Sequence, residues 1–559
     1  MKPTSIALSI AFAGSLAISG SAALAAPPQK MPFMWENATV YFLLTDRFAN
    51  GDRANDLAYG RKADAAPLRG YLGGDLKGLT AKVKEGYFDS LGVDAIWLTP
   101  PVEQIHAGTD EGTGKSYGFH GYWARDFTAL DANLGTEQDF RDFVDAAHAR
   151  GIRVLLDVVM NHTGPVTQAD PVWPADWVRT SPTCTHKDAP TTISCTLVDN
   201  LPDVRTESDT PVALPPALAE KWKKEGRYER EVKELDDFFA RTGYPRAPRY
   251  YLMKWHADWI RKYGIDGYRA DTVKHTEAGV WKELRTVTEA AHDEWKKANP
   301  GKVLGDGKFF TVAEVYNYSI GHGREFDMGG GVKTDFHANG FDSLINFSLP
   351  ADAKGGYESV FARFDTQLHG PLRGKSVLNY LDSHDDANAF DAARVKPFES
   401  ANKLLLAPGA AQIYYGDETA RRLDIAEAVG DAKLRSPMNW DELADNAARD
   451  GYRVADVRAH WSKVGQFRRA HVAIGAGRHG KLADAPYTFS RTYSGNAFAD
   501  KVVVALDVPV GKPVAIKVGG IFANGTKVRD AYADATYTVA NGAVRTGGKF
   551  NTVLLEAAP

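Results

Sequence analysis

The sequence predicts an α/β fold: a (β/α)8 barrel with a long insertion after its third strand, followed by a C-terminal antiparallel β-sandwich domain. Short apolar runs alternate with amphipathic stretches, which favours a parallel sheet. Eight such runs can be found, the number that closes a barrel. From about residue 475 the runs become short and alternating, with Gly and Asn turns, which is typical of a small antiparallel domain.

The strand candidates follow one another in order along the chain. They are residues 38–48, 94–100, 152–162, 266–271, 309–316, 341–349, 376–384 and 410–418. Amphipathic helices are expected between them, at 81–92, 136–151, 250–264 and 280–295. The second of these helices begins with a capping-box pattern, Thr136 to Asp139. An open doubly wound sheet is the alternative, but no G-x-G-x-x-G follows an early strand to support a dinucleotide site.

The N-terminus has the pattern of a secretory signal peptide. Lys2 is followed by an apolar small-residue segment, and Ala23-Leu24-Ala25 is a cleavage site. We therefore expect an exported protein, periplasmic or secreted, with no membrane anchor, because no later run is apolar enough to span a bilayer. The expected division is a signal peptide at 1–25, the barrel at 26–162 and 250–472, an irregular inserted domain at 163–249, and the C-terminal β-domain at 473–559.

Charge and cysteine content narrow the possible partners. The formal net charge of -4 over 559 residues gives no electrostatic reason to expect nucleic acid.

The chain has two cysteines, Cys184 and Cys195, and an oxidising compartment favours a disulfide between them. Closing so short a loop would stabilise the fold by about 3 kcal/mol at most. A metal site is less favoured here, because one His lies between the cysteines and no second Cys pair exists.

Polar residues gather where the predicted barrel strands end. The carboxyl ends of these strands converge on one face of a barrel, where active sites lie. The residues concerned are Asp157, Asn161, His162, Arg269, Asp271, His275, Glu314, Asp382, His384 and Asp385. A single buried carboxylate is usually a satisfied structural group. Several like charges held together cost stability, which is accepted mostly at functional sites.

A rim that carries three or more carboxylates is suited to glycoside hydrolysis. That reaction needs two carboxyl groups, one of which is a proton donor with a raised pKa. A third can stabilise the positive charge that develops on the sugar ring. Phosphoryl transfer and Ser-His-Asp hydrolysis are less favoured, because the patterns G-x-x-x-x-G-K-[ST] and G-x-S-x-G are absent.

Four short motifs resemble the signature regions of the α-amylase family (glycoside hydrolase family 13), in the family's order. They are DVVMNH, GYRADTVKH, TVAEVY and YLDSHD. HGYWARDF and LPDV resemble two further family motifs, and QIYYGDE resembles the eighth strand. The stretches WENATVYFLLTDRFANGD and LPDVRTES are similar to the periplasmic α-amylases of Gram-negative bacteria. The resemblance implies a TIM barrel called domain A, an inserted domain B and a C-terminal β-domain.

The resemblance also implies a role for each motif residue. Asp271 is expected to be the nucleophile, Glu314 the acid/base and Asp385 the transition-state stabiliser. A retaining mechanism would place the first two about 5–5.5 Å apart. Arg269 is expected to keep Asp271 ionised and oriented. The full set of expected substrate-binding residues is Tyr122, His162, Arg269, Lys274, His275 and His384.

Calcium is the implied metal. Asn161, Asp203 and the backbone of His275 match a family site that joins domains A and B, and oxygen ligands of this kind suit calcium. A second site near the first strand is implied by Asn50, Asp52, Asn55, Asp56, Gly73 and Asp75. The alternative for this second cluster is a plain Asn/Asp turn.

The implied function is endo-acting hydrolysis of α-1,4-glucans, such as starch-derived dextrins and maltooligosaccharides, by a monomer. An exo-acting maltogenic amylase, an α-glucosidase or a transglycosylase of the same family would use the same catalytic set. A non-catalytic glucan-binding protein should lack at least one catalytic carboxylate, and all three are present here.

Overall fold

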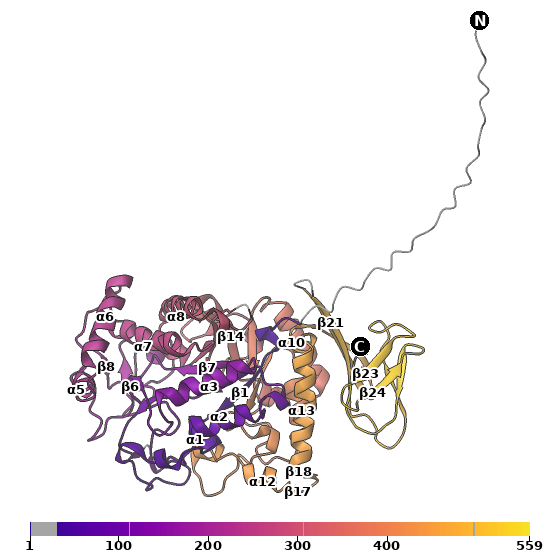
Figure 1. Ribbon diagram of the computed structural model, residues 1–559, viewed down its shortest axis with the longest axis horizontal. Helices are drawn as coiled ribbons and strands as arrows, with labels where there is room; N and C mark the ends of the chain where they lie inside the picture. The colour runs from indigo at the N-terminus through magenta and orange to yellow at the C-terminus, as the bar shows by residue number, and fades with distance from the viewer. Residues whose placement is uncertain (2–30, 111, 306, 496–497, 559) are drawn as a thin grey trace.

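Eight parallel strands close a barrel in the computed structural model, which describes residues 1, 31–110, 112–305, 307–495 and 498–558 (Figure 1). The strands in barrel order are β1 Thr39–Leu43, β2 Ala95–Leu98, β7 Arg153–Val158, β10 Gly267–Ala270, β11 Phe310–Ala313, β14 Ser343–Asn346, β15 Ser376–Asn379 and β16 Ala410–Tyr414. β16 pairs in parallel with β1 and closes the ring. The predicted TIM barrel is confirmed, and each predicted run contains one of these strands.

The register of the barrel brings the polar strand ends together. β10 lies between β7 and β11, and Arg269 of β10 is the register partner of Asp157 on β7. Asp271 and Glu314 each follow the last residue of their strand, so both stand at the same rim. Because the strands are parallel, every strand contributes its carboxyl end to this one face.

Helices surround the barrel as the alternating pattern predicted. The longer ones are α2 Leu76–Lys84, α3 Glu137–Ala149, α7 Pro248–Tyr263, α8 Ala278–Ala298, α10 Tyr357–His369, α11 Pro397–Leu405 and α13 Val454–Ala470. The predicted capping box of Thr136 and Asp139 is present at the start of α3. The helix expected at 81–92 was misplaced, because the Asp75 side chain accepts from Gly78 N and starts α2 at Leu76.

The segment between β7 and α7 contains more regular structure than we expected. It holds β8 Val178–Arg179, α4 Pro190–Ile193, β9 Asp203–Val204, α5 Pro216–Lys224 and α6 Tyr228–Thr242. The expectation of an irregular segment was wrong for α5 and α6, which lie at the end of the molecule opposite the C-terminal domain (Figure 1). In α6 the buried residues Leu235, Phe238 and Phe239 recur at helical spacing.

Short elements complete the barrel domain. They are α1 Thr45–Phe48, β3 Val102–Gln104, β4 Thr109–Asp110, β5 Lys115–Ser116, β6 Ala124–Leu130, β12 Phe326–Asp327, β13 Lys333–Thr334, α9 Leu349–Asp352, α12 Trp440–Ala444, β17 Ala448–Arg449, β18 Tyr452–Arg453 and α14 Ala473–Ala476.

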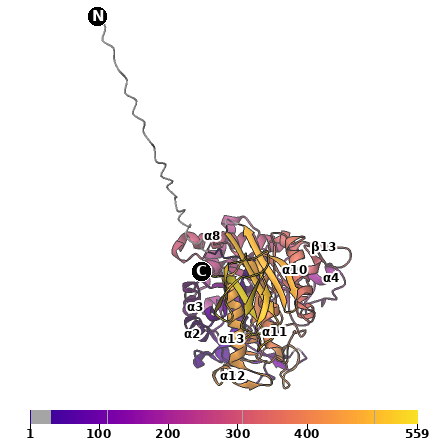
Figure 2. The ribbon, with the colours of Figure 1, turned by 90° about the vertical axis from the view of Figure 1, so that its right-hand side faces the viewer.

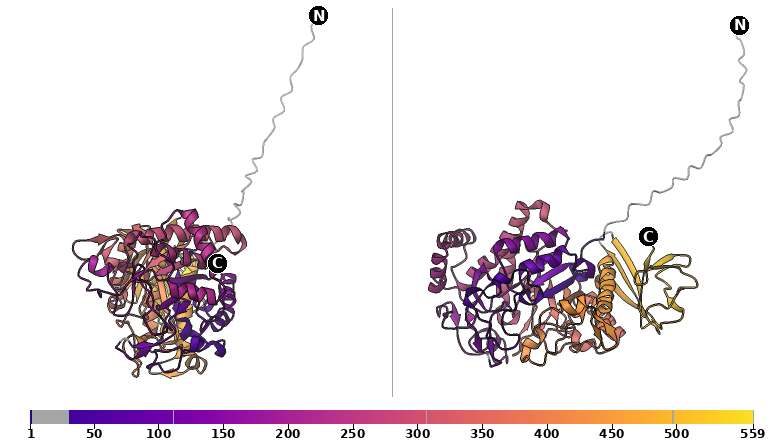
Figure 3. Two further views of the ribbon diagram at one scale, coloured as in Figure 1. Left: turned by 90° about the vertical axis from the view of Figure 1, so that its left-hand side faces the viewer. Right: turned by 60° about the horizontal axis from the view of Figure 1, so that its bottom comes forward.

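The C-terminal domain is antiparallel, as predicted. Six strands form one sheet, in the order β19 Arg478–Asp484, β20 Tyr487–Gly495, β21 Phe498–Leu506, β26 Val553–Ala557, β23 Lys527–Asp530 and β24 Ala535–Thr538. β22 Val514–Lys517 and β25 Ala543–Thr546 form a second, two-stranded sheet. Val503, Ile516 and Val544 share one buried cluster between the two sheets. Figure 2 shows the large sheet face-on, and Figure 3 shows the domain standing to one side of the barrel.

The predicted signal peptide, apart from Met1, lies outside the described residues. Within the ranges that the structure describes, no helix has both the length and the apolar character needed to cross a membrane.

Candidate active site

One buried arginine connects three carboxylates at the rim of the barrel. Arg269 Nη1 lies 2.8 Å from Asp157 Oδ1 and 2.7 Å from Asp271 Oδ1. Its Nη2 lies 3.2 Å from Glu314 Oε2. Burial alone lowers the pKa of Arg269, but Asp157 and Glu314 raise it well above its ordinary value. Arg269 is therefore a fixed cation that holds Asp271 and Glu314 facing each other.

The backbone after Asp271 is strained in a way that serves Glu314. Thr272 has φ 46°, in the left-handed region that β-branched residues rarely adopt. The Thr272 N–H donates to Glu314 Oε2 over 2.7 Å. Strain of this kind concentrates at active sites.

Glu314 is electrostatically suited to donate a proton. Burial and, to a smaller extent, the charges of Asp271 and Asp385 raise the pKa of its carboxyl to about 8, against the lowering effect of Arg269. Burial likewise raises the pKa of Asp157, which accepts from Trp97 Nε1 at 3.1 Å and Tyr122 Oη at 2.9 Å. A neutral Glu314 carboxyl can donate a proton, and Asp271 beside it can act as the nucleophile.

Asp385 is kept ionised by a second arginine, Arg435. Arg435 Nη2 donates to Asp385 Oδ1 over 2.5 Å, and Arg435 Nε donates to the carbonyl of His384 over 3.0 Å. Burial raises the pKa of Asp385, but His384 and Arg435 bring it down to about 2. Burial lowers the pKa of His384 to about 3, so at neutral pH Arg435 is the cation that keeps Asp385 charged.

The wall of the site next to these carboxylates is aromatic. The Tyr122 ring stacks on His384 with centroids 5.4 Å apart, and His120 lies on the same stack at 5.8 Å. His162 Nε2 is 3.1 Å from the Tyr122 carbonyl. An aromatic face bordered by imidazole nitrogens is suited to packing against a sugar ring and bonding its hydroxyls.

A cavity of about 600 Å3 opens over these groups. Most of the predicted site residues line it: Asp271, Glu314, Asp385, Tyr122, His162, Lys274 and His275. Arg269 and His384 stand behind the wall, where they contact the lining residues. The structure therefore brings all nine predicted catalytic and substrate-binding residues to one site.

Several lining residues were not predicted. His120, Trp123, His186, Leu197, Tyr316 and Arg435 all face the cavity. His120 and Trp123 stand within or beside the HGYW motif, and Tyr316 follows Glu314 by two positions, so the motifs contained a signal for these three. His186 and Arg435 come from loops with no periodic pattern, and only the fold places them.

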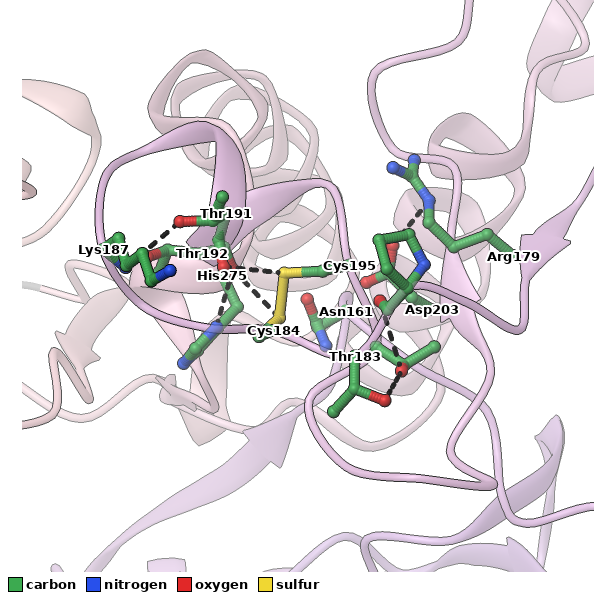
Figure 4. Close-up of a disulfide and its surroundings, with 12 residues drawn as sticks. Asn161, Arg179, Thr183, Cys184, Lys187, Thr191, Thr192, Cys195, Asp203 and His275 are labelled. Carbon is green, nitrogen blue, oxygen red and sulfur yellow. Dashed lines mark hydrogen bonds and ion pairs between the residues drawn. A yellow bond between two sulfur atoms is a disulfide. The ribbon is translucent and has the colours of Figure 1, made fainter.

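The predicted first calcium set forms a cluster of oxygens beside the disulfide. The side-chain amide of Asn161 has one terminal atom 3.2 Å from Asp203 Oδ1 and 2.9 Å from the His275 carbonyl (Figure 4). An amide nitrogen in that position donates to both, whereas an amide oxygen leaves three oxygens facing one another, as around a cation. The second orientation also directs Asn161 Nδ2 at His162 Nδ1, 3.4 Å away.

The disulfide closes the loop that covers this cluster. Cys184 and Cys195 are bonded, as predicted. The loop between them supplies the Thr192 carbonyl, which lies 2.9 Å from His275 Nδ1 (Figure 4). The loop therefore fixes the ring of a cavity-lining histidine from the side of the inserted segment.

The residues of the predicted second calcium site also lie close together, but two of their carboxylates already have hydrogen-bond or ion-pair partners in the protein. Asp75 accepts from Gly51 N, Asp52 N and Gly78 N, and Asp52 pairs with Lys77 at 2.6 Å. Among the rest, Asn50 Nδ2 donates to Asp56 Oδ1 over 2.8 Å beside Gly73, and Asn55 Oδ1 is a buried acceptor without a partner among the described residues. Within the described residues, no group of three or more His, Cys, Asp or Glu side chains is arranged as a metal site.

Comparison with known proteins identifies the family. The family profile described as "Alpha amylase, catalytic domain" matches residues 42–474. The chain belongs to the α-amylase family. It is 38% identical over 510 residues to the periplasmic alpha-amylase of Escherichia coli (strain K12), which covers 81% of this chain and 69% of that protein. It is 27% identical over 390 residues to the cyclomaltodextrin glucanotransferase of Thermoanaerobacterium thermosulfurigenes, covering 68% of this chain and 49% of that protein.

A solved structure agrees with the fold. The α-amylase from Geobacillus thermoleovorans, complexed with acarbose, superposes with a TM-score of 0.65 at 22% identity, over 94% of this chain and 99% of that one. This α-amylase-family chain has relatives that support a glycoside hydrolase, and it spans about two thirds of the length of the Escherichia coli protein and about half of the length of the cyclomaltodextrin glucanotransferase.

Proposed function

We propose that this α-amylase-family chain is a retaining, endo-acting α-1,4-glucan hydrolase that cleaves starch-derived dextrins and maltooligosaccharides. Asp271 attacks the anomeric carbon, and Glu314 gives its proton to the departing oxygen. A glycosyl-enzyme ester forms at Asp271. Glu314, now ionised, then takes a proton from water, which releases the sugar with its anomeric configuration retained.

The observation that carries this proposal is the bridging of Asp271 and Glu314 by Arg269. Two carboxylates that contact one guanidinium lie near each other, which supports the retaining geometry, in which the two carboxyl groups are about 5–5.5 Å apart. Asp385, ionised and outside this pair, is placed to stabilise the positive charge that develops on the ring. Tyr122 and His162 provide the stacking face and the hydrogen bonds for that sugar.

The test is to incubate the chain with maltoheptaose and record proton NMR spectra from the first minutes. We expect new α-anomeric reducing ends and products of several lengths. Glu314→Gln should lower the rate roughly 10²- to 10⁴-fold, because proton transfer by a positioned acid contributes that much. Lys233→Met, on the exposed surface of α6, is the control and should leave the rate unchanged.

Other outcomes would revise the proposal. First products of β configuration would contradict the retaining roles of Asp271 and Glu314. A single short product released from one end would favour the exo-acting alternative, and products longer than the substrate would favour transglycosylation. Absence of turnover, with calcium present, would favour a binding protein.

Calcium is part of the proposal. Asn161, Asp203 and the His275 carbonyl would hold one ion between the barrel and the inserted segment, and their facing oxygens support this. Asn50, Asn55 and Asp56 would hold a second, supported by the buried acceptor of Asn55. When bound, calcium supplies cross-linking of the segments around the cleft.

The test for calcium has two readouts. Metal analysis should find two calcium ions per chain, and Asp203→Asn should lower the number to one. Removing calcium with a chelator should lower the melting temperature of the unmodified chain, because a ligand that binds only the folded state stabilises it. An unchanged calcium content in Asp203→Asn would overturn the first site.

Export and oligomeric state complete the proposal. The N-terminal pattern and the periplasmic relative support an exported protein. We expect the chain to be a monomer, which sedimentation of the mature protein would test.

A further inference from the structure

A hairpin in the segment that follows β11 ends in three successive glycines. Gly329, Gly330 and Gly331 lie between β12 and β13 and have φ values of 82°, 62° and 82°, a region that glycine adopts without steric cost. The base of the hairpin is fixed, because Phe326 and Met328 are buried in the main hydrophobic core. The three glycines therefore form the tip of a hairpin that is anchored in the barrel domain.

The tip of this hairpin packs directly on the backbone of the disulfide loop, the loop between Cys184 and Cys195. A Cβ atom on Gly329 would lie 2.6 Å from the Lys187 carbonyl oxygen and 3.1 Å from Asp188 Cα, so no larger residue fits unless one segment moves. A Cβ atom on Gly331 would have no atom of the described residues within 4 Å, apart from its chain neighbours. Figure 2 shows β13 beside α4, the short helix of the disulfide loop.

The part of the disulfide loop that the hairpin contacts is held together by Thr191. The amides of Lys187 and Asp188 both donate to Thr191 Oγ1 over 3.1 Å, and this hydroxyl donates to Asp188 Oδ1 over 2.7 Å (Figure 4). Thr192 Oγ1 donates to the Asp188 carbonyl over 2.8 Å. A displacement of Lys187 and Asp188 is therefore passed on to Thr191 and Thr192.

The same loop orients two imidazoles of the active-site cavity. The Thr192 carbonyl lies 2.9 Å from His275 Nδ1. Because a carbonyl oxygen only accepts, Nδ1 carries the proton, and Nε2 is the nitrogen that can accept from a sugar hydroxyl. His186, which belongs to the loop, lies edge-on to His275 with ring centroids 5.4 Å apart, and both residues line the cavity.

The disulfide by itself does not fix this loop to the barrel. It joins the two ends of the loop to each other, and Ala189 and Ile193 are only partly buried against the main core. The hairpin adds a contact at Lys187 and Asp188, next to His186 in the sequence. Two segments of the barrel domain therefore hold the loop, the hairpin at Lys187 and Asp188 and the segment after β10 through His275.

We propose that Gly329 is a positioning residue: its contact with Lys187 and Asp188 holds the disulfide loop in place and thereby keeps the rings of His186 and His275 oriented toward the glucan. This inference rests on the proposed function. The hairpin acts at a distance, since within the described residues none of 326–334 lines the cavity.

The test compares Gly329→Ala with Gly331→Ala, which is the matched control. Both glycines have φ 82°, so alanine brings the same backbone strain to each, and only at 329 does the added methyl group meet another segment. With calcium in excess, Gly329→Ala should raise KM for maltoheptaose about tenfold, the equivalent of one hydrogen bond to the substrate, and change kcat less than about twofold. Gly331→Ala should leave both values nearly unchanged.

A spectroscopic signal distinguishes loss of orientation from a general loss of stability. In protein with isotope-labelled histidine, the ring nitrogen signals of His275 are assigned by their disappearance in His275→Gln. Gly329→Ala should shift the Nδ1 signal of His275, because the hydrogen bond to Thr192 changes, and Gly331→Ala should not.

A second variant keeps the test valid if Gly329→Ala does not fold. Thr191→Val keeps the shape of the side chain and removes the hydroxyl that holds Lys187 and Asp188. It should raise KM for maltoheptaose and shift the His275 signal in the same direction as Gly329→Ala.

The outcomes separate this inference from the proposed function. If the unmodified chain cleaves maltoheptaose but neither Gly329→Ala nor Thr191→Val changes KM or the His275 signal, the inference is overturned and the proposed function stands. Equal effects of Gly329→Ala and Gly331→Ala would also overturn it, because backbone strain would then be the cause. If the unmodified chain does not cleave maltoheptaose, the proposed function itself fails.

Discussion

Glu314 gives the residue-scale prediction, because its protonation state decides whether it acts as an acid. Burial raises its pKa to about 8. In the proposed mechanism the protonated form is the active one, so kcat/KM should hold through neutral pH and fall as pH rises through about 8. The measurement is the pH profile of kcat/KM for maltoheptaose between pH 5 and pH 10. A decline centred near pH 5 would show that Glu314 has an ordinary pKa and would remove this argument.

At the residue scale, the sequence predicts the carboxylates of the candidate active site better than the residues that contact and orient them. Asp271 and Glu314 stand directly after buried strands, and the parallel barrel brings such positions together whatever the loops do. Arg435 was not predicted, because it lies in the loop beyond β16, where no period or motif constrains the chain. Its contact with Asp385 depends on how that loop folds back across the rim.

The element-scale prediction concerns Arg394, which connects two barrel strands by contacting one carboxylate beyond the end of each. Its Nη1 donates to Asp382, beyond the end of β15, and its Nη2 donates to Asp417, beyond the end of β16, each over 2.7 Å. Its backbone has φ 58°, in the left-handed region. Arg394→Met would leave two buried carboxylates without their cation, so we expect a loss of roughly 3–5 kcal/mol in the free energy of unfolding.

Chemical denaturation of Arg394→Met measures this loss, and Arg422→Met is the matched control. Arg422 has a side chain that is 52% exposed and lies 3.9 Å from Asp424. We expect its replacement to change the free energy of unfolding by less than about 0.5 kcal/mol. Equal effects of the two substitutions would contradict the role of Arg394.

Also at the element scale, strands and helices were predicted correctly where the spacing of apolar residues agrees with the alternation of strands and helices along the chain. All eight barrel strands were found, since buried parallel strands are nearly continuous apolar runs. The helices α5 and α6 were missed because they lie in a Pro- and Thr-rich segment whose composition outweighed a local helical period. α2 starts where it does because the Asp75 side chain caps the helix. The spacing of apolar residues does not reveal this cap.

At the scale of the whole molecule, the C-terminal domain shares its core with the barrel. Along β21, Val503 belongs to the cluster inside the β-domain, whereas Val502 and Val504 belong to the main hydrophobic core. Both faces of the second half of this strand, residues 502–506, are therefore buried, which explains the unbroken apolar run there. Arg491 of β20 strengthens the junction, because its Nη1 and Nη2 donate to the Leu406 carbonyl beyond α11.

His471, at this same junction, gives the last prediction. Its Nδ1 lies 2.9 Å from Asp500 Oδ1 and its Nε2 lies 2.7 Å from Glu556 Oε2, so both ring nitrogens face carboxylates. Burial lowers the pKa of His471, but Asp500 and Glu556 outweigh burial and raise the pKa to about 9. The protonated ring therefore stabilises the folded state fully below the unfolded-state pKa of about 6.5, and this stabilisation is lost as pH rises through about 9.

The matched substitution is His471→Gln, which removes the charge and keeps a polar side chain. The unmodified chain should exceed the variant in free energy of unfolding, and the difference should shrink by about 3 kcal/mol between pH 6 and pH 10. Urea denaturation at several pH values measures the difference. A difference that stays constant with pH would mean that His471 acts by packing alone. A shrinking difference would mean that the barrel and the β-domain are joined by a protonated histidine whose contribution depends on pH.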